Sequence, residues 1–230
     1  MTTPRSAIAF AVLALLLPNA GDESYNLIRR AKPGDQLTYS MTMQFKSDGT
    51  DIEMTSTALD TVKELKEGVM KTERILRDVV LQTPGGEQHL GDVSKTVVVQ
   101  KVTGEVTDIQ RDRKREDQLR IALASQVVVP YKAVKIGDTW AIDRVASKKD
   151  GTVAMKLAYK AERTEQFRGE LGVLISVDSK ELSGRTPISA TGSALVSVTT
   201  GAILRSVLTI QNVPLSDGPP VSAKLTLVAR

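Results

Sequence analysis

Apolar and polar residues alternate along much of this chain, and this alternation restricts the possible folds more than any other feature of the sequence. In the stretch 37–45, every odd-numbered residue is Leu, Tyr, Met or Phe and every even-numbered one is Thr, Ser or Gln. The pattern returns in the stretches 153–160, 188–199 and 221–227. Side chains of a β-strand point alternately to its two sides, so each stretch predicts a strand with one apolar face. We therefore expect a mainly β fold with an antiparallel sheet.

Turn signals separate the predicted strands. Each signal contains a glycine, which readily adopts the left-handed backbone conformation of tight hairpins. The turns are Asp48-Gly49, Glu67-Gly68, Gly85-Gly86, Thr103-Gly104, Asp150-Gly151, Thr200-Gly201 and Asp217-Gly218. Their spacing predicts antiparallel meanders that form a curved sheet, a half-barrel or a sandwich, and the pattern alone does not choose among these three.

Three short motifs, two of which are turn signals, recur in the same order about a hundred residues later in the chain. The motif Lys-x-Gly-Asp occurs at 32–35 and 135–138, Asp-Gly-Thr at 48–50 and 150–152, and Thr-Gly at 103–104 and 200–201. A meander has one apolar face that it cannot bury alone, and two copies can bury both. We expect a single β domain, residues 21–230, built of two repeats at about 32–110 and 135–212. Superposing the repeats should align Gly34 with Gly137, Gly49 with Gly151, and Tyr39 with Trp140.

One segment departs from the alternation and predicts a short helix that bridges the repeats. Residues 112–126 contain good helix formers and neither Gly nor Pro, and Leu119, Leu123 and Val127 lie four apart on one face. Pro130 ends the element. A basic cluster at its start suggests either nucleic-acid or anionic-lipid binding, or a solvated helix face. Acids interrupt the cluster and the net charge is +4, so we favour the solvated face and expect no nucleic-acid partner.

The N-terminus has the layout of a secretory signal peptide. One arginine precedes an apolar run at 6–17, and Pro18-Asn19-Ala20 ends in a small residue. Twelve residues are fewer than the roughly 20 that span a bilayer, so a membrane anchor is the less favoured alternative. We expect residues 1–20 to be removed and the mature chain, which has no further transmembrane segment, to be periplasmic or extracellular. The chain has no cysteine, which excludes disulfides and lipid attachment to a cysteine.

The sequence offers little for catalysis. His89 is the single histidine and lies in the polar stretch "PGGEQHLGD", which reads as a surface loop. No Gly-x-Ser-x-Gly elbow, phosphate-binding loop or metal-ligand spacing is present. A pair of carboxylates would suffice for a glycosidase, and the sequence leaves that possibility open. We expect no enzyme activity and assign no catalytic residue, metal ligand or cofactor.

Two apolar strand faces are the candidate binding surface. They carry Met and Tyr side chains that adapt to irregular ligands but fill ordinary cores equally well. The candidate residues are Tyr39, Met41, Met43, Met155, Leu157 and Tyr159. Trp140, the single tryptophan, is either a core residue or a binding anchor, and we favour the core.

Three segments carry a resemblance to a known group of proteins. They are "KPGDQLTY" from residue 32, "VPYKAVKIGDTW" from residue 129 and "TGAILRSVLTIQ" from residue 200. Together they resemble an uncharacterised family of exported bacterial β-proteins with a Lys-Pro-Gly start and a central Pro-x-x-x-Val-x-x-Gly-Asp-x-Trp motif. More distantly, such proteins resemble the half-barrel folds that carry lipoproteins or lipids across the periplasm. That second resemblance implies an apolar ligand on the concave face of a curved sheet.

We therefore expect an exported, non-catalytic binding or carrier protein for an apolar or amphipathic ligand, such as a lipid or lipoprotein. The alternative is a structural or interaction module of the bacterial cell envelope. An internal cavity separates the two, since a carrier needs roughly 300 Å³ or more of apolar volume and a scaffold packs solid.

Overall fold

The computed structural model describes residues 23–47, 49–110, 116–147, 152–215 and 218–230. The expected signal peptide and the whole basic cluster (Arg111, Arg113, Lys114 and Arg115) lie outside these residues. So does Gly151, whose alignment with Gly49 is therefore not tested.

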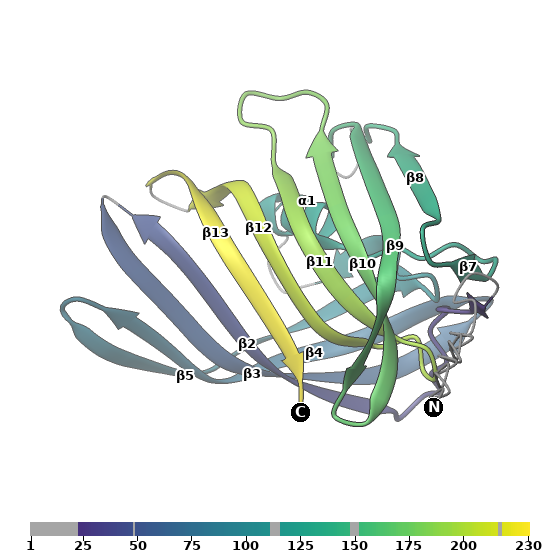
Figure 1. Cartoon of the computed structure of the whole chain (residues 1–230). Helices are drawn as coiled ribbons and strands as arrows, with labels where there is room; N and C mark the ends of the chain where they lie inside the picture. The colour runs from purple at the N-terminus through teal and green to yellow at the C-terminus, as the bar shows by residue number, and fades with distance from the viewer. Residues whose placement is uncertain (1–22, 48, 111–115, 148–151, 216–217) are drawn as a thin grey trace, which may run out of the picture.

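One large antiparallel sheet dominates the molecule and confirms the predicted mainly β fold (Figure 1). Its strand order is β6-β5-β4-β3-β2-β13-β12-β11-β10-β9-β8, and a short pair, β1 and β7, lies apart from it. The strands are β1 (Ser24–Tyr25), β2 (Gln36–Ser47), β3 (Thr50–Lys66), β4 (Val69–Thr83), β5 (Gly86–Lys101), β6 (Val106–Gln110), β7 (Val134–Lys135), β8 (Thr139–Arg144), β9 (Met155–Phe167), β10 (Glu170–Glu181), β11 (Ser189–Ser197), β12 (Ile203–Leu215) and β13 (Gly218–Ala229).

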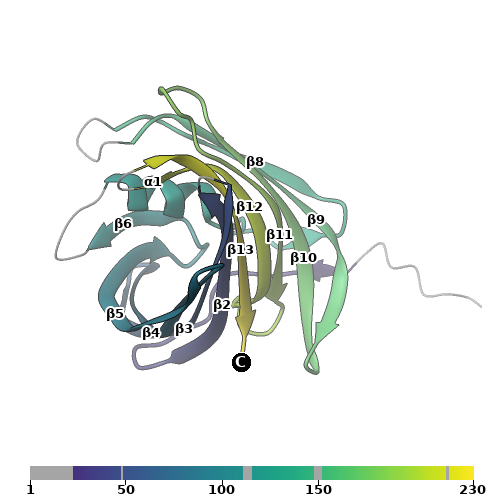
Figure 2. The same cartoon turned by 90° about the vertical axis from the view of Figure 1, so that its left-hand side faces the viewer.

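Two meanders meet at the centre of this sheet. All neighbouring strands are consecutive in sequence except β2 and β13, which join the N-terminal meander to the C-terminal one. The edges of the sheet are β6 and β8. The chain passes from one edge to the other through the helix, and the sheet curls around it (Figure 2). The expected curved sheet is thus present, with the helix on its concave side.

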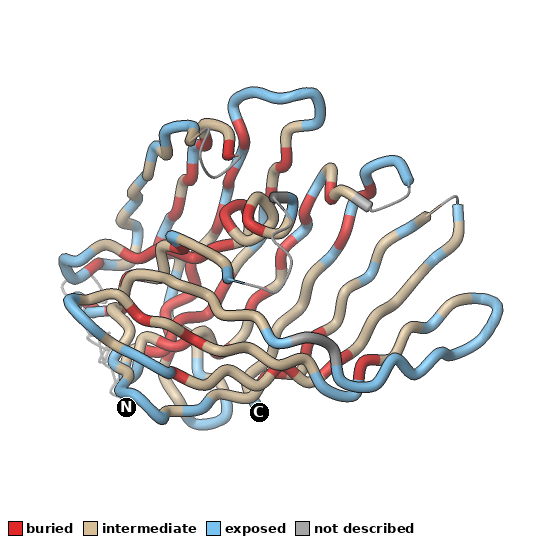
Figure 3. The backbone as a smooth tube through the Cα atoms, turned by 180° about the vertical axis from the view of Figure 1, so that it is seen from behind, coloured by how far each residue is buried: buried red, intermediate tan, exposed pale blue. Residues whose placement is uncertain are grey.

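The helix α1 (Glu116–Ser125) fills the concave face of the C-terminal meander. Leu119 and Leu123 are buried, as the four-residue spacing predicted, and they belong to the same core as Leu157 and Ile175 of β9 and β10. The Ser179 hydroxyl of β10 donates a hydrogen bond to the carbonyl of Ala124 at 2.5 Å. Buried residues are dense on this half of the sheet, whereas the far ends of the β2–β5 hairpins are intermediate or exposed (Figure 3). The two halves of the concave face are therefore filled differently.

The two Gly-Asp motifs have the same local structure. The Asp35 carboxylate accepts a hydrogen bond from the backbone N–H of Lys32, and the Asp138 carboxylate accepts one from Lys135, both at 2.9 Å. Gly34 and Gly137 both have φ of +94°, a conformation that suits glycine. Each motif thus begins its meander with the same turn.

The same correspondence continues along the paired strands. Gly34 N–H donates to the Val62 carbonyl at 2.8 Å and Gly137 N–H donates to the Ala161 carbonyl at 2.7 Å, which fixes the strand register alike in both meanders. The β3–β4 hairpin turns at Glu67-Gly68 and the β9–β10 hairpin at Arg168-Gly169, each with φ positive at both residues. These matches support the tandem duplication, which remains our proposal.

The register changes one detail of the expected alignment. Leu37 lies opposite Asp60 in the first meander, and Trp140 lies opposite Tyr159 in the second. Counted from the Gly-Asp motifs, Trp140 therefore corresponds to Leu37, and the expected correspondence of Trp140 with Tyr39 is two residues off. Both aromatic residues point to the concave side, so the period-two pattern alone could not separate these registers.

Candidate functional site

A pocket of about 220 Å³ lies on the concave side of the N-terminal meander. We call it the concave pocket. It is lined by inward-facing residues of β2–β5, by residues of β12 and β13, by the N-terminal segment at 27 and 29, and by residues 122–129. Its apolar walls are formed by Leu27, Leu37, Val62, Met70, Val98, Leu225 and Leu227. Four polar residues from the N-terminal segment and three strands also line it, and we call Arg29, Tyr39, Asp60 and Arg74 the charged cluster.

The N-terminal segment brings Arg29 to this pocket. Its backbone lies across the end of the sheet, where Arg29 N–H donates to the Val102 carbonyl at 2.9 Å and Arg30 N–H donates to the Thr200 carbonyl at 2.8 Å. The approach is close, because a Cβ on Gly201 would lie 2.4 Å from the Ile28 carbonyl oxygen. Glycine in the Thr200-Gly201 turn therefore makes room for the N-terminal segment that carries Arg29. We call this segment the N-terminal strap.

Asp60 and Arg74 form a bidentate ion pair across β3 and β4. They are direct cross-strand neighbours, and Arg74 donates from Nε and from one terminal nitrogen to the two carboxylate oxygens, each at 2.7 Å. Burial opposes the charge on Arg74, but the Asp60 carboxylate outweighs it, so the pKa of the guanidinium is raised. The Arg74 side chain is 35% exposed and the Asp60 side chain is 14% exposed.

Tyr39 and Arg29 complete the cluster. Burial raises the pKa of Tyr39 to about 12, with a further contribution from Asp60, and a hydrogen bond from Arg29 acts in the opposite direction. The Tyr39 phenol is therefore neutral at physiological pH and keeps its proton.

Several polar atoms here lack hydrogen-bond partners. Arg29 Nε and Thr72 Oγ1 are buried in the pocket wall, and neither has a partner among the described residues. Ser56 Oγ, nearby on β3, is in the same state. More than about nine-tenths of buried polar groups in proteins are hydrogen-bonded, so such a concentration is unusual. Neighbouring atoms cover these donors, so a polar ligand group would satisfy them after a shift of the side chains that cover them.

The equivalent positions in the second meander are apolar. Asp60, opposite Leu37, corresponds to Tyr159, opposite Trp140, and Arg74 corresponds to Val177, the β10 neighbour of Tyr159. Tyr159 and Val177 are buried in the core beneath α1. The first meander thus places charges where the second places core side chains.

The structure separates the six residues of the expected ligand face. Tyr39 lines the concave pocket, and Met41 and Met43 follow it on the same face of β2 but do not line it. Met155, Leu157 and Tyr159 are buried in the core. The first group lies on β2 and the second on β9, and four strands of the sheet lie between them. The six residues therefore do not form one surface.

Sequence reasoning did not identify Arg29, Asp60 or Arg74. A signal was present for two of them, since Asp60 follows Ala58 and Arg74 follows Thr72 on faces that are otherwise apolar or small. A charged side chain at a core-facing position of a strand is costly to bury unless it is paired and hydrogen-bonded. Arg29 lies in a segment without alternation, and its place could not be read from the chain.

Trp140 is half-buried and has a structural role. Its indole Nε1–H donates to the Val128 carbonyl at 2.8 Å, and its ring stacks on Tyr159 with 5.6 Å between centroids. The Tyr159 hydroxyl donates to the Gln126 carbonyl at 3.1 Å. Together they hold the segment after α1 against the sheet. This supports the core role of Trp140.

His89 is exposed, as expected, but it does not lie in a loop. It belongs to β5, where it pairs with Val80, and its ring contacts the Glu87 carboxylate at 2.8 Å. The expectation was wrong because β5 already begins at Gly86, directly after the hairpin turn. Within the described ranges, no group of three or more His, Cys, Asp or Glu could hold a metal ion. In the same parts of the chain no helix has the length and apolarity to cross a membrane.

A second, more open groove of about 760 Å³ lies at the hairpin ends of β2–β4. Four of its polar residues pair with one another, Gln44 with Glu53 at 2.6 Å and Lys46 with Asp51 at 3.3 Å. It lacks the buried unpartnered groups of the concave pocket, which is the stronger candidate.

Comparison with known proteins adds little to this geometry. No protein-family model matches the sequence, and no curated protein is significantly similar to it. Among solved structures, the chain is similar to one from Bacteroides fragilis described as a "putative exported protein with YmcC-like fold". The identity is 11%, the alignment covers 90% of this chain and 99% of that one, and the TM-score is 0.34. So distant a likeness implies nothing about ligand or activity here, and the motif resemblance stays an expectation.

Proposed function

We propose that this chain is an exported, non-catalytic protein that binds a small amphipathic ligand in the concave pocket. The observation that carries this proposal is the pocket itself, in which apolar walls surround a charged cluster. Its Asp60 and Arg74 have the core residues Tyr159 and Val177 as counterparts in the second meander. Ligand pockets typically combine apolar lining with a few placed polar groups. Export rests on the N-terminal sequence.

The volume of the pocket limits the size of the ligand that it can hold. Its volume of about 220 Å³ is below the roughly 300 Å³ expected for a carrier of a drug-sized or larger molecule. It has room for about seven groups the size of a water molecule. We therefore propose a single short apolar chain or ring with a polar head, rather than a complete lipid or the acyl chains of a lipoprotein.

The state of Asp60 supports binding rather than catalysis. It is the single acid among the described residues that line the pocket, and Arg74 binds both of its oxygens. Each oxygen of this carboxylate already accepts a charge-assisted hydrogen bond, so a substrate would have to compete with Arg74 for either oxygen. A glycosidase would also need a second carboxylate close by.

Native mass spectrometry of protein purified from its own host tests the proposal. We expect a bound small molecule in the wild-type protein. The variant Leu227→Trp, which fills the pocket, should lose it, and the matched variant Leu182→Trp, at a site 60% exposed, should keep it. A wild-type spectrum without added mass, and no release of a small molecule on denaturation, would favour the envelope interaction module instead.

A further inference from the structure

We propose that the ligand of the concave pocket is a monoanion, and that its carboxylate head binds Arg29. This inference rests on the proposed function and specifies the ligand class.

The charges of the pocket leave one cation without an acid. Four charged residues line it, namely Arg29, Asp60, Arg74 and Lys101. Arg74 is paired with Asp60, and Lys101 Nζ is paired with Glu105 at 2.7 Å. Arg29 has no ion pair with an acid in the part of the chain that the structure describes, and its Nε is buried without a partner. Arg29 as a whole is half-buried, and a partly desolvated cation without an anion is unfavourable, so the pocket favours a negative charge.

The free donors around Arg29 match a carboxylate. Arg29 Nε–H and the Thr72 hydroxyl are both unpartnered, and Thr72 is 6% exposed. The neutral Tyr39 hydroxyl, in contact with Arg29, is a further potential donor. A carboxylate has two oxygens with about four acceptor positions, and hydrogen bonds to it are shorter and stronger than neutral ones.

The balance of charge favours a monoanion over a dianion. Arg29, Arg74 and Asp60 together carry +1, so a single negative charge makes the cluster neutral. A phosphate dianion would leave one negative charge uncompensated in a partly dry pocket, which is unfavourable. Beyond the cluster, Leu37, Val62 and Leu227 offer apolar contacts to the remainder of the ligand. The structure thus fits a carboxylate with a short apolar tail.

Isothermal titration calorimetry with four probes of equal chain length tests this assignment. The probes are octanoate, octan-1-ol, octylamine and octyl phosphate, titrated into the mature chain after removal of any co-purified ligand. We expect octanoate to bind at least about tenfold more tightly than each of the other three. Arg29→Gln should weaken octanoate binding at least about tenfold, the size of effect typical of a lost charged hydrogen bond. Arg30→Gln changes the exposed neighbouring arginine and should leave the affinity unchanged.

A second variant keeps the test decisive if Arg29→Gln does not fold. Thr72→Val retains the shape of the side chain and removes the unpartnered hydroxyl. We expect it to weaken octanoate binding several-fold and to leave octan-1-ol binding unchanged.

The outcomes separate this inference from the proposed function. Equal affinity for octan-1-ol and octanoate, or equal behaviour of Arg29→Gln and Arg30→Gln, would overturn the anion site and leave an apolar pocket. Tighter binding of octyl phosphate would overturn the monoanion. Absence of octanoate binding at millimolar concentration would overturn the inference, while the native mass of host-purified protein still decides whether the pocket holds a ligand.

Discussion

At the scale of single residues, Trp140 shows how a side chain of the first strand in a meander can hold a distant segment in place. Its indole both donates to the Val128 carbonyl and stacks on Tyr159. We expect Trp140→Ala to lower the free energy of unfolding by about 3 kcal/mol, the lower end for large aromatic truncations because the side chain is half-buried. Urea denaturation followed by circular dichroism measures this. An unchanged midpoint would mean that the indole is not part of the core.

A control separates the ring from its hydrogen bond. Trp140→Phe keeps most of the stacking surface and leaves the Val128 carbonyl without this donor. We expect it to cost about 1 kcal/mol, the net value of one hydrogen bond. A loss as large as that of the alanine variant would assign the whole effect to the hydrogen bond.

The charged cluster shows which residue-level features a sequence can and cannot predict. Tyr39 was identified because it continues an alternating apolar face. Asp60 and Arg74 occupy the same kind of register, so their charges were visible as exceptions, but their pairing depends on the β3–β4 register, with its shift between Val62 and Glu64. Arg29 reaches the pocket through contacts with two turns more than 70 residues away in sequence, and no local pattern encodes such contacts.

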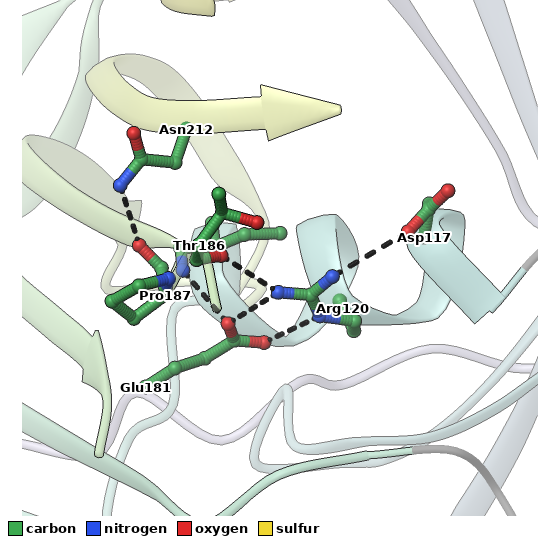
Figure 4. Close-up of polar contacts among 7 residues, drawn as sticks. Asp117, Arg120, Glu181, Thr186, Pro187 and Asn212 are labelled. Atoms are coloured by element: carbon green, nitrogen blue, oxygen red, sulfur yellow. Dashed lines mark hydrogen bonds and ion pairs between the residues drawn. The ribbon is translucent and has the colours of Figure 1, made fainter. Parts of the chain in front are cut away.

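At the scale of elements, a buried ion pair joins α1 to β10 (Figure 4). Arg120 Nε and a terminal nitrogen donate to the two oxygens of Glu181 at 2.8 and 2.7 Å, and Glu181 also accepts the backbone N–H of Ile188 at 2.7 Å. A second bond from Arg120 goes to the Thr186 carbonyl at 3.0 Å, so the same side chain holds the β10–β11 loop. The hydrogen bonding to the Glu181 carboxylate raises the pKa of Arg120.

Breaking this pair should be costly because Glu181 is fully buried. Arg120→Met would leave a carboxylate with 0% exposure and a single backbone donor. We expect a loss of about 3–5 kcal/mol in thermal or urea unfolding. The variant Asp117→Asn is the matched control, because Asp117 is 55% exposed and contacts Arg120 at 3.5 Å, and it should cost less than about 0.5 kcal/mol. Similar losses in both variants would contradict a special role for Glu181.

The elements themselves were largely predictable, whereas their partners were not. Strands and hairpins follow from period-two alternation and glycine turns, and the helix ends at Ser125, one residue before the predicted end. The pairing of β2 with β13 joins segments about 180 residues apart, and a meander pattern describes neighbours in sequence alone. That pairing is what places Leu225 and Leu227 opposite Met43 and Met41, and so forms one wall of the concave pocket.

At the scale of the whole molecule, the proposed duplication explains why one half of the concave face is filled and the other is hollow. Among the residues that the structure describes, one helix bridges the meanders, and it covers the second meander. The first meander is covered by the N-terminal strap and by residues 126–129, which leave the concave pocket between them and the sheet. The charged cluster lies in this hollow half. The asymmetry between two similar meanders is therefore the structural basis of the proposed binding site.

This asymmetry predicts that the Asp60–Arg74 pair is not needed for stability. Arg74→Met alone leaves Asp60 partly buried without its partner, and Asp60→Leu alone does the same to Arg74. We expect each single variant to lose about 2–3 kcal/mol, less than for a fully buried pair because the pocket exposes part of Arg74. The double variant makes the first meander apolar at the positions of Tyr159 and Val177, and its unfolding free energy should lie within about 1 kcal/mol of the wild type. If the loss in the double variant equals the sum of the two single losses, measured by urea denaturation of all four proteins, the two charges act independently and each of the two residues is needed for the stability of the fold.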